Sequence, residues 1–564
     1  MSDTPGNEAP KSASITVEGR RCEFDPATKP SLLQVALDNG IEIPHYCYHP
    51  GMSVVASCRI CLAEVSQPNP RNDNKLELIP KLVPTCQTPA VDGAVIHLQS
   101  PKTVGNQKAV MEYLLINHPL DCPVCDQAGE CSLQDYSYRY GNSQSRFQED
   151  KIKQPKKDLG AVLLYSDRCI MCSRCVRFTR EVTGTDELGI FGRGSEEQID
   201  VFPGKPLDNP LAGNVVDICP VGALLDKDFL MSMRVWNLTK TPSIDGITAS
   251  GDNLSVETND GKIYRLKPRT NLDVNQWWTS DEIRYGWKHV HSPERLTTPL
   301  VKRHGTHEPV DFNTAYDTLL EKLEVAKLKK GEGSLAFVVS PMLSCEEAYL
   351  LGKLAKQLDP QALLAVGPVP IDGEDQTFPG GYTVRAEKAP NARGVRRALE
   401  SVFDGVLDFA DVDFANIHAV VLTGNYPQAW ITDELKSALD GKFVAVIDTL
   451  PNALVDAGIG GADVVLPGAT WLEKAGTFEN ADGRLQTFVE AIPVLEGPSG
   501  FAKPEGQIAT DLLARLEGTR PEKFDAARVR EELGALPGGG VFTSDVHRPT
   551  EEDIPLSEVE FVAL

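Results

Sequence analysis

The cysteines are the residues of this sequence whose types and spacing most clearly suit chemistry. The chain has 13 of them, and all except Cys345 lie between Cys22 and Cys219. Disulfides are rare in large proteins of reducing compartments, and clustered cysteines in such a chain indicate metal or redox chemistry. Their spacing defines three groups, and each group is a candidate metal centre.

The first group is spaced C-x10-C-x2-C-x24-C and consists of Cys47, Cys58, Cys61 and Cys86. Two ligands from a tight loop, one before it and one far downstream are typical of plant-type [2Fe–2S] ferredoxins, although their first spacing is C-x4-C. The flanking residues predict a hairpin over 14–17 and 22–24 and a helix over 31–39. A four-cysteine zinc site is the alternative, but zinc ribbons favour two C-x2-C pairs and only one is present.

The second group is spaced H-x3-C-x2-C-x5-C and consists of His118, Cys122, Cys125 and Cys131. It follows a predicted helix over 104–116. By spacing alone, a zinc site of three cysteines and one histidine fits as well as an iron–sulfur cluster does. Three cysteines close behind His118 favour a ligand role for its imidazole. A neutral imidazole in place of a thiolate makes a cluster less negative, which raises its reduction potential.

The third group begins with the run C-x2-C-x2-C, formed by Cys169, Cys172 and Cys175. In bacterial two-cluster ferredoxins the run continues to C-x3-C-P, and the fourth cysteine binds the other cluster. Thr179 occupies that position here. The second Cys-Pro pair is Cys219-Pro220, and its three companion positions hold Val215, Ala212 and Asn209. Both halves lack the ligands of the same cluster. This predicts one remaining cluster held by Cys169, Cys172, Cys175 and Cys219.

Two cysteines lie outside these groups. Cys22 falls in a predicted strand, where we expect a buried thiol. Cys345 follows Ser344 in a capping-box pattern that opens a helix, a position that can lower the pKa of a thiol. We expect an ordinary structural role for Cys345.

The C-terminal part alternates short apolar segments with helical ones. Strands are predicted over 335–340, 418–423, 443–448 and 462–466, and helices over 344–357 and 432–440. This alternation predicts a doubly wound sheet.

The order of the three groups resembles the electron-input part shared by three families. These are the large iron–sulfur subunit of respiratory complex I (the 75 kDa type), NAD-linked hydrogenases and NAD-linked formate dehydrogenases. The resemblance covers about residues 12–235. It implies a [2Fe–2S] cluster at the first group, a [4Fe–4S] cluster at each of the other two, and electrons passing along all three.

The rest of the chain separates these families. Residues 471–486, 261–263 and 265–269 resemble molybdopterin oxidoreductases. No cysteine lies between Cys219 and Cys345, so the additional cluster that many such domains carry at their start cannot form. The domain is also short for an enzyme that wraps two pterin cofactors. A fold kept without its catalytic site matches the complex I subunit, so no bound molybdopterin and no catalytic residue are expected.

The rival interpretations each lack something. An iron-only hydrogenase would need several cysteines after residue 220, and a formate dehydrogenase would need a molybdenum ligand. The electron-transfer subunit of an NAD-linked nickel hydrogenase would end near residue 240. A zinc-stabilised scaffold without redox activity is the alternative from a different class.

The expected fold class is multidomain, with α+β and α/β parts. The domains we expect are a plant-type ferredoxin β-grasp over 12–100, a one-His-three-Cys [4Fe–4S] segment over 101–150, a degenerate bacterial-ferredoxin-like [4Fe–4S] domain over 151–235, a molybdopterin-oxidoreductase-like α/β domain over 236–520 and an extended C-terminal arm over 521–564.

Composition narrows the setting of the protein. The net charge of −24 disfavours a general nucleic-acid binder, because phosphate would repel the chain. No apolar run approaches the roughly 18–20 residues that cross a bilayer, and Met1–Ile15 has no features of a targeting segment. There is no Walker-type motif and no convincing G-x-G-x-x-G after a strand. We therefore expect NADH and FMN on partner subunits, and a peripheral location on the cytoplasmic side of the cell membrane.

These expectations combine into an electron relay within NADH:quinone oxidoreductase. The chain would accept single electrons from a flavin- and NADH-binding subunit and pass them towards quinone. It would have no complete active site of its own, and its partners would be subunits of the peripheral arm.

Overall fold

The computed structural model describes residues 12–455, 461–497 and 500–549. The chain divides into two compact units. The first contains the residues up to Asn237 together with Phe378–Tyr382, and the second contains Leu238–Thr377 and the described residues from Thr383 onward. All three groups of candidate ligands lie in the first unit.

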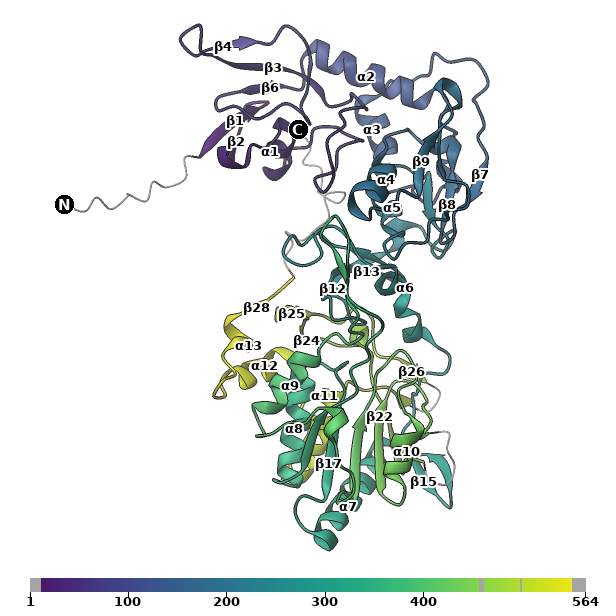
Figure 1. Ribbon diagram of the computed structural model, residues 1–564, viewed down its shortest axis with the longest axis vertical. Coiled ribbons are helices and arrows are strands. Elements are labelled where there is room, and N and C mark those ends of the chain that lie inside the picture. Colours follow the sequence, from purple (N-terminus) through teal and green to yellow (C-terminus); the bar gives the residue numbers. More distant parts are fainter. Residues whose placement is uncertain (1–11, 456–460, 498–499, 550–564) are drawn as a thin grey trace, which may run out of the picture. The chain divides into compact units, whose positions relative to one another are not determined.

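The first unit begins with a mixed sheet of order β2-β1-β6-β3-β4, with β5 paired to β3 (Figure 1). Its elements are β1 (Ala13–Val17), β2 (Arg20–Phe24), α1 (Leu32–Asp38), β3 (Leu62–Asn69), β4 (Lys75–Leu78), β5 (Val83–Pro84) and β6 (Val95–His97). The predicted hairpin and helix are therefore confirmed. Alternate residues of β1 are buried, and the Ser31 hydroxyl caps α1 by accepting the Gln34 N–H at 3.1 Å.

Two helices follow the sheet and carry the second group of ligands. Helix α2 (Pro101–Leu115) starts at Ser100, whose hydroxyl accepts the Thr103 N–H, and it has proline at its first position. The second group lies between α2 and α3 (Ser132–Tyr140), which begins directly after Cys131. The predicted helix over 104–116 corresponds to α2.

The remainder of the first unit is built from short elements around the third group. These are β7 (Lys156–Asp158), β8 (Val162–Tyr165), α4 (Arg174–Arg177), β9 (Leu188–Phe191), β10 (Gln198–Val201), α5 (Asn214–Asp217) and β11 (Leu224–Asp226). Strands β11, β8 and β7 form one antiparallel sheet, and β9 pairs with β10. The tip Phe378–Tyr382 joins this unit through the Gly380 N–H, which donates to the Val182 carbonyl at 2.9 Å.

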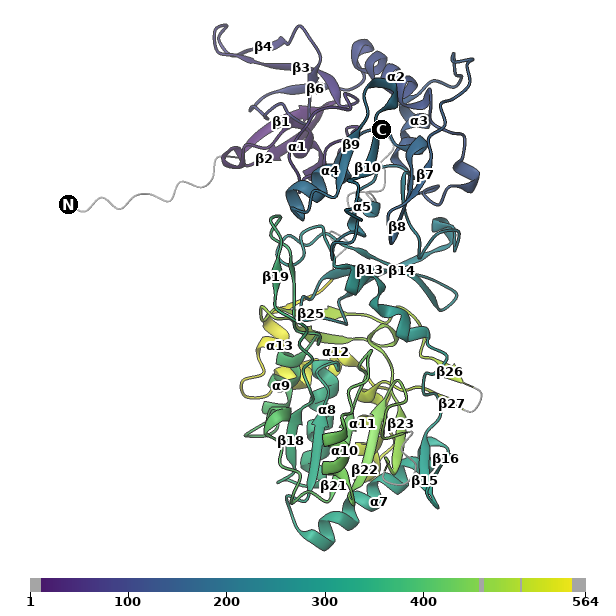
Figure 2. The same ribbon diagram turned by 45° about the vertical axis from the view of Figure 1, so that its right-hand side comes forward.

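The second unit opens with an antiparallel sheet of β12 (Thr239–Ile244), β13 (Asn253–Asn259) and β14 (Lys262–Pro268), followed by α6 (Asp281–Tyr285). Its centre is a seven-stranded sheet of order β16-β15-β23-β22-β21-β17-β18 (Figure 2). The strands of that sheet are β15 (Leu300–Arg303), β16 (Thr306–Pro309), β17 (Leu335–Val339), β18 (Leu363–Val366), β21 (Ala419–Thr423), β22 (Phe443–Asp448) and β23 (Val464–Pro467).

The five strands from β17 to β23 are parallel, and helices cover both faces of the sheet. One apolar core joins the sheet to α7 (Phe312–Lys330), α8 (Cys345–Leu358), α9 (Ala392–Glu400) and α11 (Glu505–Glu517), and another joins it to α10 (Asp433–Leu439). Numbered along the chain, the parallel strands have the order 2-1-3-4-5. This confirms the predicted doubly wound sheet and places its switch point between β17 and β21.

Short pairings complete this unit: β19 (Gln376–Thr377) with β20 (Thr383–Val384), β24 (Gly476–Glu479) with β25 (Leu485–Phe488), and β26 (Glu496–Gly497) with β27 (Gly500–Phe501).

The chain after residue 521 differs from the extended arm that we expected. It forms α12 (Ala526–Gly534), α13 (Val541–Ser544) and β28 (Val546–His547), which pairs with β25. Val529, Leu533 and Phe542 are buried in the same core as α8. The glycine-rich run after Pro537 is a turn between two packed helices, so local composition did not reveal the burial of its neighbours. Residues 550–564 lie outside the described part.

Candidate functional site

The four thiols of the first group form two close pairs. Cys61 Sγ lies 3.4 Å from Cys86 Sγ, and the Cys47 and Cys58 thiols are hydrogen-bonded to each other. The hydrogen bond from Cys58 lowers the pKa of Cys47 to about 5, and that from Cys86 lowers the pKa of Cys61 to about 7. Two pairs of thiols match a two-iron cluster, in which four cysteines supply the ligands.

The ligand loop of this group is held in an uncommon backbone conformation. Ala56 and Arg59, on either side of Cys58, have φ of 49° and 61°. For residues with a side chain this left-handed region costs about 1–2 kcal/mol each, and such conformations gather at ligand clamps. Folding energy is therefore spent on the shape of this loop.

The second group lines a cavity of about 280 Å³ together with Asp121, Ala128, Gln134, Arg168 and Gly222. All four candidate ligands, His118, Cys122, Cys125 and Cys131, take part in the lining. Burial lowers the pKa of His118 to about 4, which keeps the imidazole neutral near pH 7. Its Nδ1 is buried and has no hydrogen-bond partner among the described residues. A neutral imidazole beside three thiols is a suitable donor set for an iron–sulfur cluster.

Gly222 is a residue of this second site that sequence spacing did not identify. A Cβ at this position would lie 2.2 Å from Cys125 Sγ, so only glycine allows the backbone to come this close. Arg168 donates to the Gly222 carbonyl and forms an ion pair with Asp121, with Nη2 to Oδ2 at 2.8 Å. The one available signal was the position of Gly222 just after Cys219-Pro220.

The third group lines a second cavity, of about 360 Å³. Cys169, Cys172, Cys175 and Cys219 all face it, although Cys219 is 44 residues beyond Cys175. Apolar side chains such as Leu164, Ile199 and Leu224 form most of the remaining wall. Burial raises the pKa of Cys169 to about 12 and that of Cys172 to about 11. These thiols would therefore remain protonated near pH 7 on their own, and bound iron is what would ionise them.

The loop of the third group repeats the device seen in the first. Met171 and Ser173 alternate with the cysteines and have φ of 52° and 60°. The Met171 N–H donates to Cys169 Sγ at 3.4 Å. Amide hydrogen bonds to cluster sulfur raise the reduction potential. Within the described ranges no three His, Cys, Asp or Glu side chains gather closely enough for a single metal ion, and the thiols here surround a cavity.

The positions that match the absent cluster are filled by the chain itself. Thr179 lies in a π-helix, Phe178–Val182, and is fully buried, as are Ala212 and Val215. Glu187, also buried, accepts hydrogen bonds from the Thr185 hydroxyl at 2.7 Å and the Asn209 N–H at 3.1 Å. A carboxylate satisfied by these donors now stabilises this half of the domain.

One apolar cluster connects all three groups. Tyr46, fully buried next to Cys47, packs in it with Cys131, and partly buried Cys58, Cys169, Cys172 and Cys219 lie against it. The Tyr46 hydroxyl donates to Met111 Sδ at 3.2 Å. The three sites therefore share one interior from which apolar side chains exclude water.

The two remaining cysteines are buried. Cys22 lies in β2 and Cys345 is the first residue of α8, after a complete capping box of Ser344 and Glu347. Burial raises the pKa of both thiols, so the helix N-terminus does not activate Cys345.

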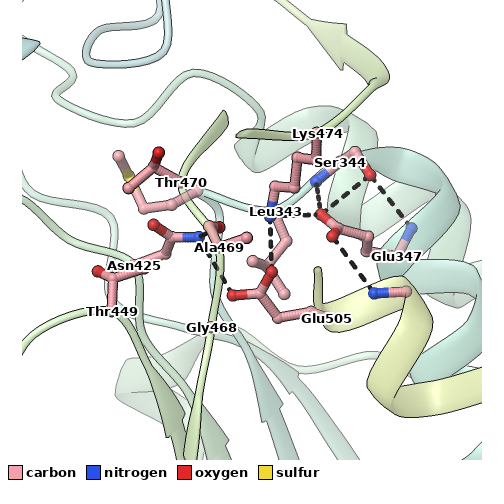
Figure 3. Close-up of polar contacts among 12 residues, drawn as sticks. Leu343, Ser344, Glu347, Asn425, Thr449, Gly468, Ala469, Thr470, Lys474 and Glu505 are labelled. Atoms are coloured by element: carbon pink, nitrogen blue, oxygen red, sulfur yellow. Dashed lines mark hydrogen bonds and ion pairs between the residues drawn. The ribbon is translucent and has the colours of Figure 1, made fainter. Parts of the chain in front are cut away.

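In the second unit the carboxyl edge of the parallel sheet is filled by charged side chains (Figure 3). Lys474 Nζ lies 2.9 Å from Glu347 Oε2 and 2.6 Å from Glu505 Oε2, and all three side chains are buried. Asn425, just after β21, donates to Glu505 Oε1 at 3.1 Å and to the Ala469 carbonyl at 2.7 Å. Open α/β sheets bind ligands at this edge, and here the chain's own side chains satisfy one another.

Models of five protein families match the chain. They are a 2Fe-2S iron-sulfur cluster binding domain over residues 11–101, the NADH-ubiquinone oxidoreductase-G iron-sulfur binding region over 107–146, the NADH-quinone oxidoreductase subunit 3 ferredoxin-like domain over 160–225, the NADH-ubiquinone oxidoreductase NDSU1/NuoG-like 4Fe-4S domain over 238–288, and molybdopterin oxidoreductase over 295–448 and 409–515. These matches indicate 2Fe-2S and 4Fe-4S binding domains. The 238–288 stretch contains no cysteine, in keeping with the expectation that its cluster cannot form.

None of the described helices is long and apolar enough to cross a membrane.

Curated relatives carry the same names as the family models. The chain is 40% identical to the mitochondrial 78 kDa subunit of NADH-ubiquinone oxidoreductase from Neurospora crassa, over 55% of this chain and 40% of that subunit. It is 29% identical to the Candida albicans counterpart, over 96% of this chain and 87% of that subunit. It is 34% identical to the NADH-quinone oxidoreductase-G protein of Rickettsia felis, over 61% of this chain and 49% of that protein.

The aligned stretch thus spans less than half of the Neurospora and Rickettsia proteins and most of the Candida one. The family models follow the same order as the three ligand groups and the doubly wound sheet. The chain belongs to the family of large iron–sulfur subunits of NADH:quinone oxidoreductase, the 75 kDa type.

Proposed function

We propose that the chain is an electron-relay subunit of NADH:quinone oxidoreductase. The observation that supports this best is the convergence of Cys169, Cys172, Cys175 and the distant Cys219 on one apolar cavity. Four thiols around a cavity suit a [4Fe–4S] cluster, whereas a structural zinc ion needs four ligands at one point.

The proposed ligands follow the three groups. The [2Fe–2S] cluster would be held by Cys47, Cys58, Cys61 and Cys86, and the two [4Fe–4S] clusters by His118, Cys122, Cys125 and Cys131 and by Cys169, Cys172, Cys175 and Cys219. Bound at these sites, the clusters would supply one-electron carriers in series. The chain's own residues fix the ligand loops, exclude water through the cluster around Tyr46, and offer amide hydrogen bonds to sulfur.

The proposed direction of transfer is from NADH to quinone. Two electrons leave NADH on a flavin-binding partner subunit, enter this chain one at a time and leave towards the quinone-reducing part of the complex. The partners are therefore the flavin subunit and other peripheral-arm subunits. The proposed location is peripheral, on the cytoplasmic side of the membrane, which the chain meets only through the complex.

The second unit is proposed to serve as a structural domain without molybdopterin. Lys474, Glu347 and Glu505 already neutralise and hydrogen-bond one another where a ligand of such a sheet would bind. Its role would be packing against neighbouring subunits.

Metal analysis combined with EPR tests the proposal. Anaerobically purified chain is expected to contain iron and acid-labile sulfide, with about ten irons if all three clusters are present. The reduced protein should show one [2Fe–2S] signal and additional [4Fe–4S] signals. Zinc without sulfide would replace the relay with a scaffold, and molybdenum or tungsten would show that the second unit binds a catalytic cofactor.

A further inference from the structure

Helix α4 carries Cys175 between two arginines that reach the first ligand group. Arg174 donates through Nη1 to the Ile218 carbonyl at 3.2 Å and through Nη2 to the Tyr48 carbonyl at 2.5 Å. Arg177, three residues later and on the same helix face, donates to the carbonyls of Ser53 and Cys47. One helix of the third site thus holds the backbone of the first site's ligand loop.

Neither arginine has a carboxylate partner within the described ranges, where backbone carbonyl oxygens accept the hydrogen bonds of both. The Nε of each is buried and donates no hydrogen bond. Arg177 is 5% exposed, and Arg174 lines the same cavity as the four thiols of the third group. Burying a cation without a counter-charge is costly, so the fold must supply an anion for these two.

The cysteines are the nearest source of that anion. Arg174 lies within electrostatic reach of Cys172 and Cys47, and its positive charge opposes the rise that burial causes in the pKa of Cys172. A cluster with four thiolate ligands carries a net negative charge, which grows by one with each electron taken up. Net charge is one of the factors that set the potential of such clusters.

The second site provides an internal contrast. Arg168 lines its cavity, but Asp121 neutralises it, and one of the candidate ligands there is a neutral imidazole. Of the three described ligand groups, the first and third are therefore the ones that meet arginines without a carboxylate partner.

We propose that Arg174 and Arg177 are positioning residues that act as shared counter-charges for the first and third clusters. Their positive charge stabilises the reduced form of each cluster and raises both reduction potentials. Their carbonyl contacts also fix the first ligand loop on α4. This inference rests on the proposed function, because it requires clusters at both groups.

The test compares charge removal with charge retention at each position. Arg174→Gln, Arg174→Lys, Arg177→Gln and Arg177→Lys would be purified anaerobically as full-length chain and titrated with dithionite as the electron donor. EPR would follow the reduction of each cluster, and iron and sulfide would be measured in every sample. Arg180→Gln is the control, because Arg180 lies nearby, is 64% exposed and pairs with Asp186.

We expect both glutamine variants to lower the midpoint potentials of the first and third clusters. The lysine variants should stay near the wild-type values, because lysine keeps the charge while losing the two-pronged contact. The cluster of the second group and the control should not change. Absence of a lower potential in glutamine variants with full iron content would overturn the inference.

Two other outcomes are also decisive. If lysine and glutamine variants lose the same iron, the carbonyl contacts matter and the counter-charge role is wrong. If wild-type protein contains no iron and sulfide, the proposed function itself fails, which is distinct from the failure of this inference.

Discussion

The two units solve the burial of polar groups in opposite ways. In the first unit buried groups are left without protein partners: His118 Nδ1, the Nε atoms of Arg174 and Arg177, and thiols that face two cavities. In the second unit, at the edge where its sheet would bind a ligand, Lys474 is matched by Glu347 and Glu505. Buried polar groups must be satisfied. The difference teaches that the first unit is built around something the chain does not itself supply, whereas this edge of the second is complete.

The largest effect should come from removing one ligand of the third cavity. Cys175→Ser takes away a buried thiol that no neighbour can replace, so about four of the irons should be lost. In the assembled complex we expect NADH-to-quinone transfer to be interrupted, while reduction of an artificial acceptor at the flavin site is largely retained. Unchanged quinone reduction would contradict the relay role. Cys345→Ser is a matched control, because Cys345 is buried in the second unit.

A smaller but site-specific effect is expected at the second cavity. Gly222→Ala places a methyl group 2.2 Å from Cys125 Sγ, so the thiol must move and the second cluster should be lost or distorted. EPR should show the other two clusters unchanged. Gly105→Ala is the control, since a Cβ there meets nothing within 4 Å. A normal second-cluster signal in Gly222→Ala would show that the cavity does not depend on this close approach.

The completed edge of the second unit should respond in stability and not in iron content. Lys474→Met leaves two buried carboxylates without their cation, which costs about 3–5 kcal/mol. Tryptophan fluorescence during urea unfolding reports on this unit, because only Trp236 lies in the first unit. Combining Lys474→Met with Glu347→Gln and Glu505→Gln should recover part of the loss. If Lys474→Met lowered iron content instead, the contrast between the units would be wrong.

The smallest effect is a pH dependence within the second unit. Burial, reinforced by Asp252, raises the pKa of Asp245 to about 8. Between roughly pH 4 and 8 the folded state holds a proton that the unfolded state has released, so stability should fall as pH rises through this range. One proton gives a slope of at most about 1.4 kcal/mol per pH unit. Asp245→Asn should flatten the urea-midpoint profile, whereas Asp440→Asn, at an exposed position, should not; equal slopes in all three proteins would exclude Asp245 as the titrating group.

The sequence by itself determined the local elements and the candidate ligands. Cysteine spacing is a local property of a loop, so the three groups could be identified without knowing the fold. The same holds for the hairpin at β1 and β2, the capping box of α8 and the apolar strands of the doubly wound sheet, whose patterns depend on near neighbours. Val215, Ala212, Asn209 and Thr179 likewise identified the half that lacks ligands.

Only the tertiary structure decided which residues meet across the fold. Arg174 and Arg177 touch the first ligand loop about 125 residues away, as the separations of their hydrogen bonds show. Gly222 matters because Cys125 packs against it, and Glu187 because Asn209 folds onto it. The helices after residue 521 are buried through α8, which composition could not indicate. These contacts depend on loop closure over long stretches of chain, for which a single sequence carries no periodic signal.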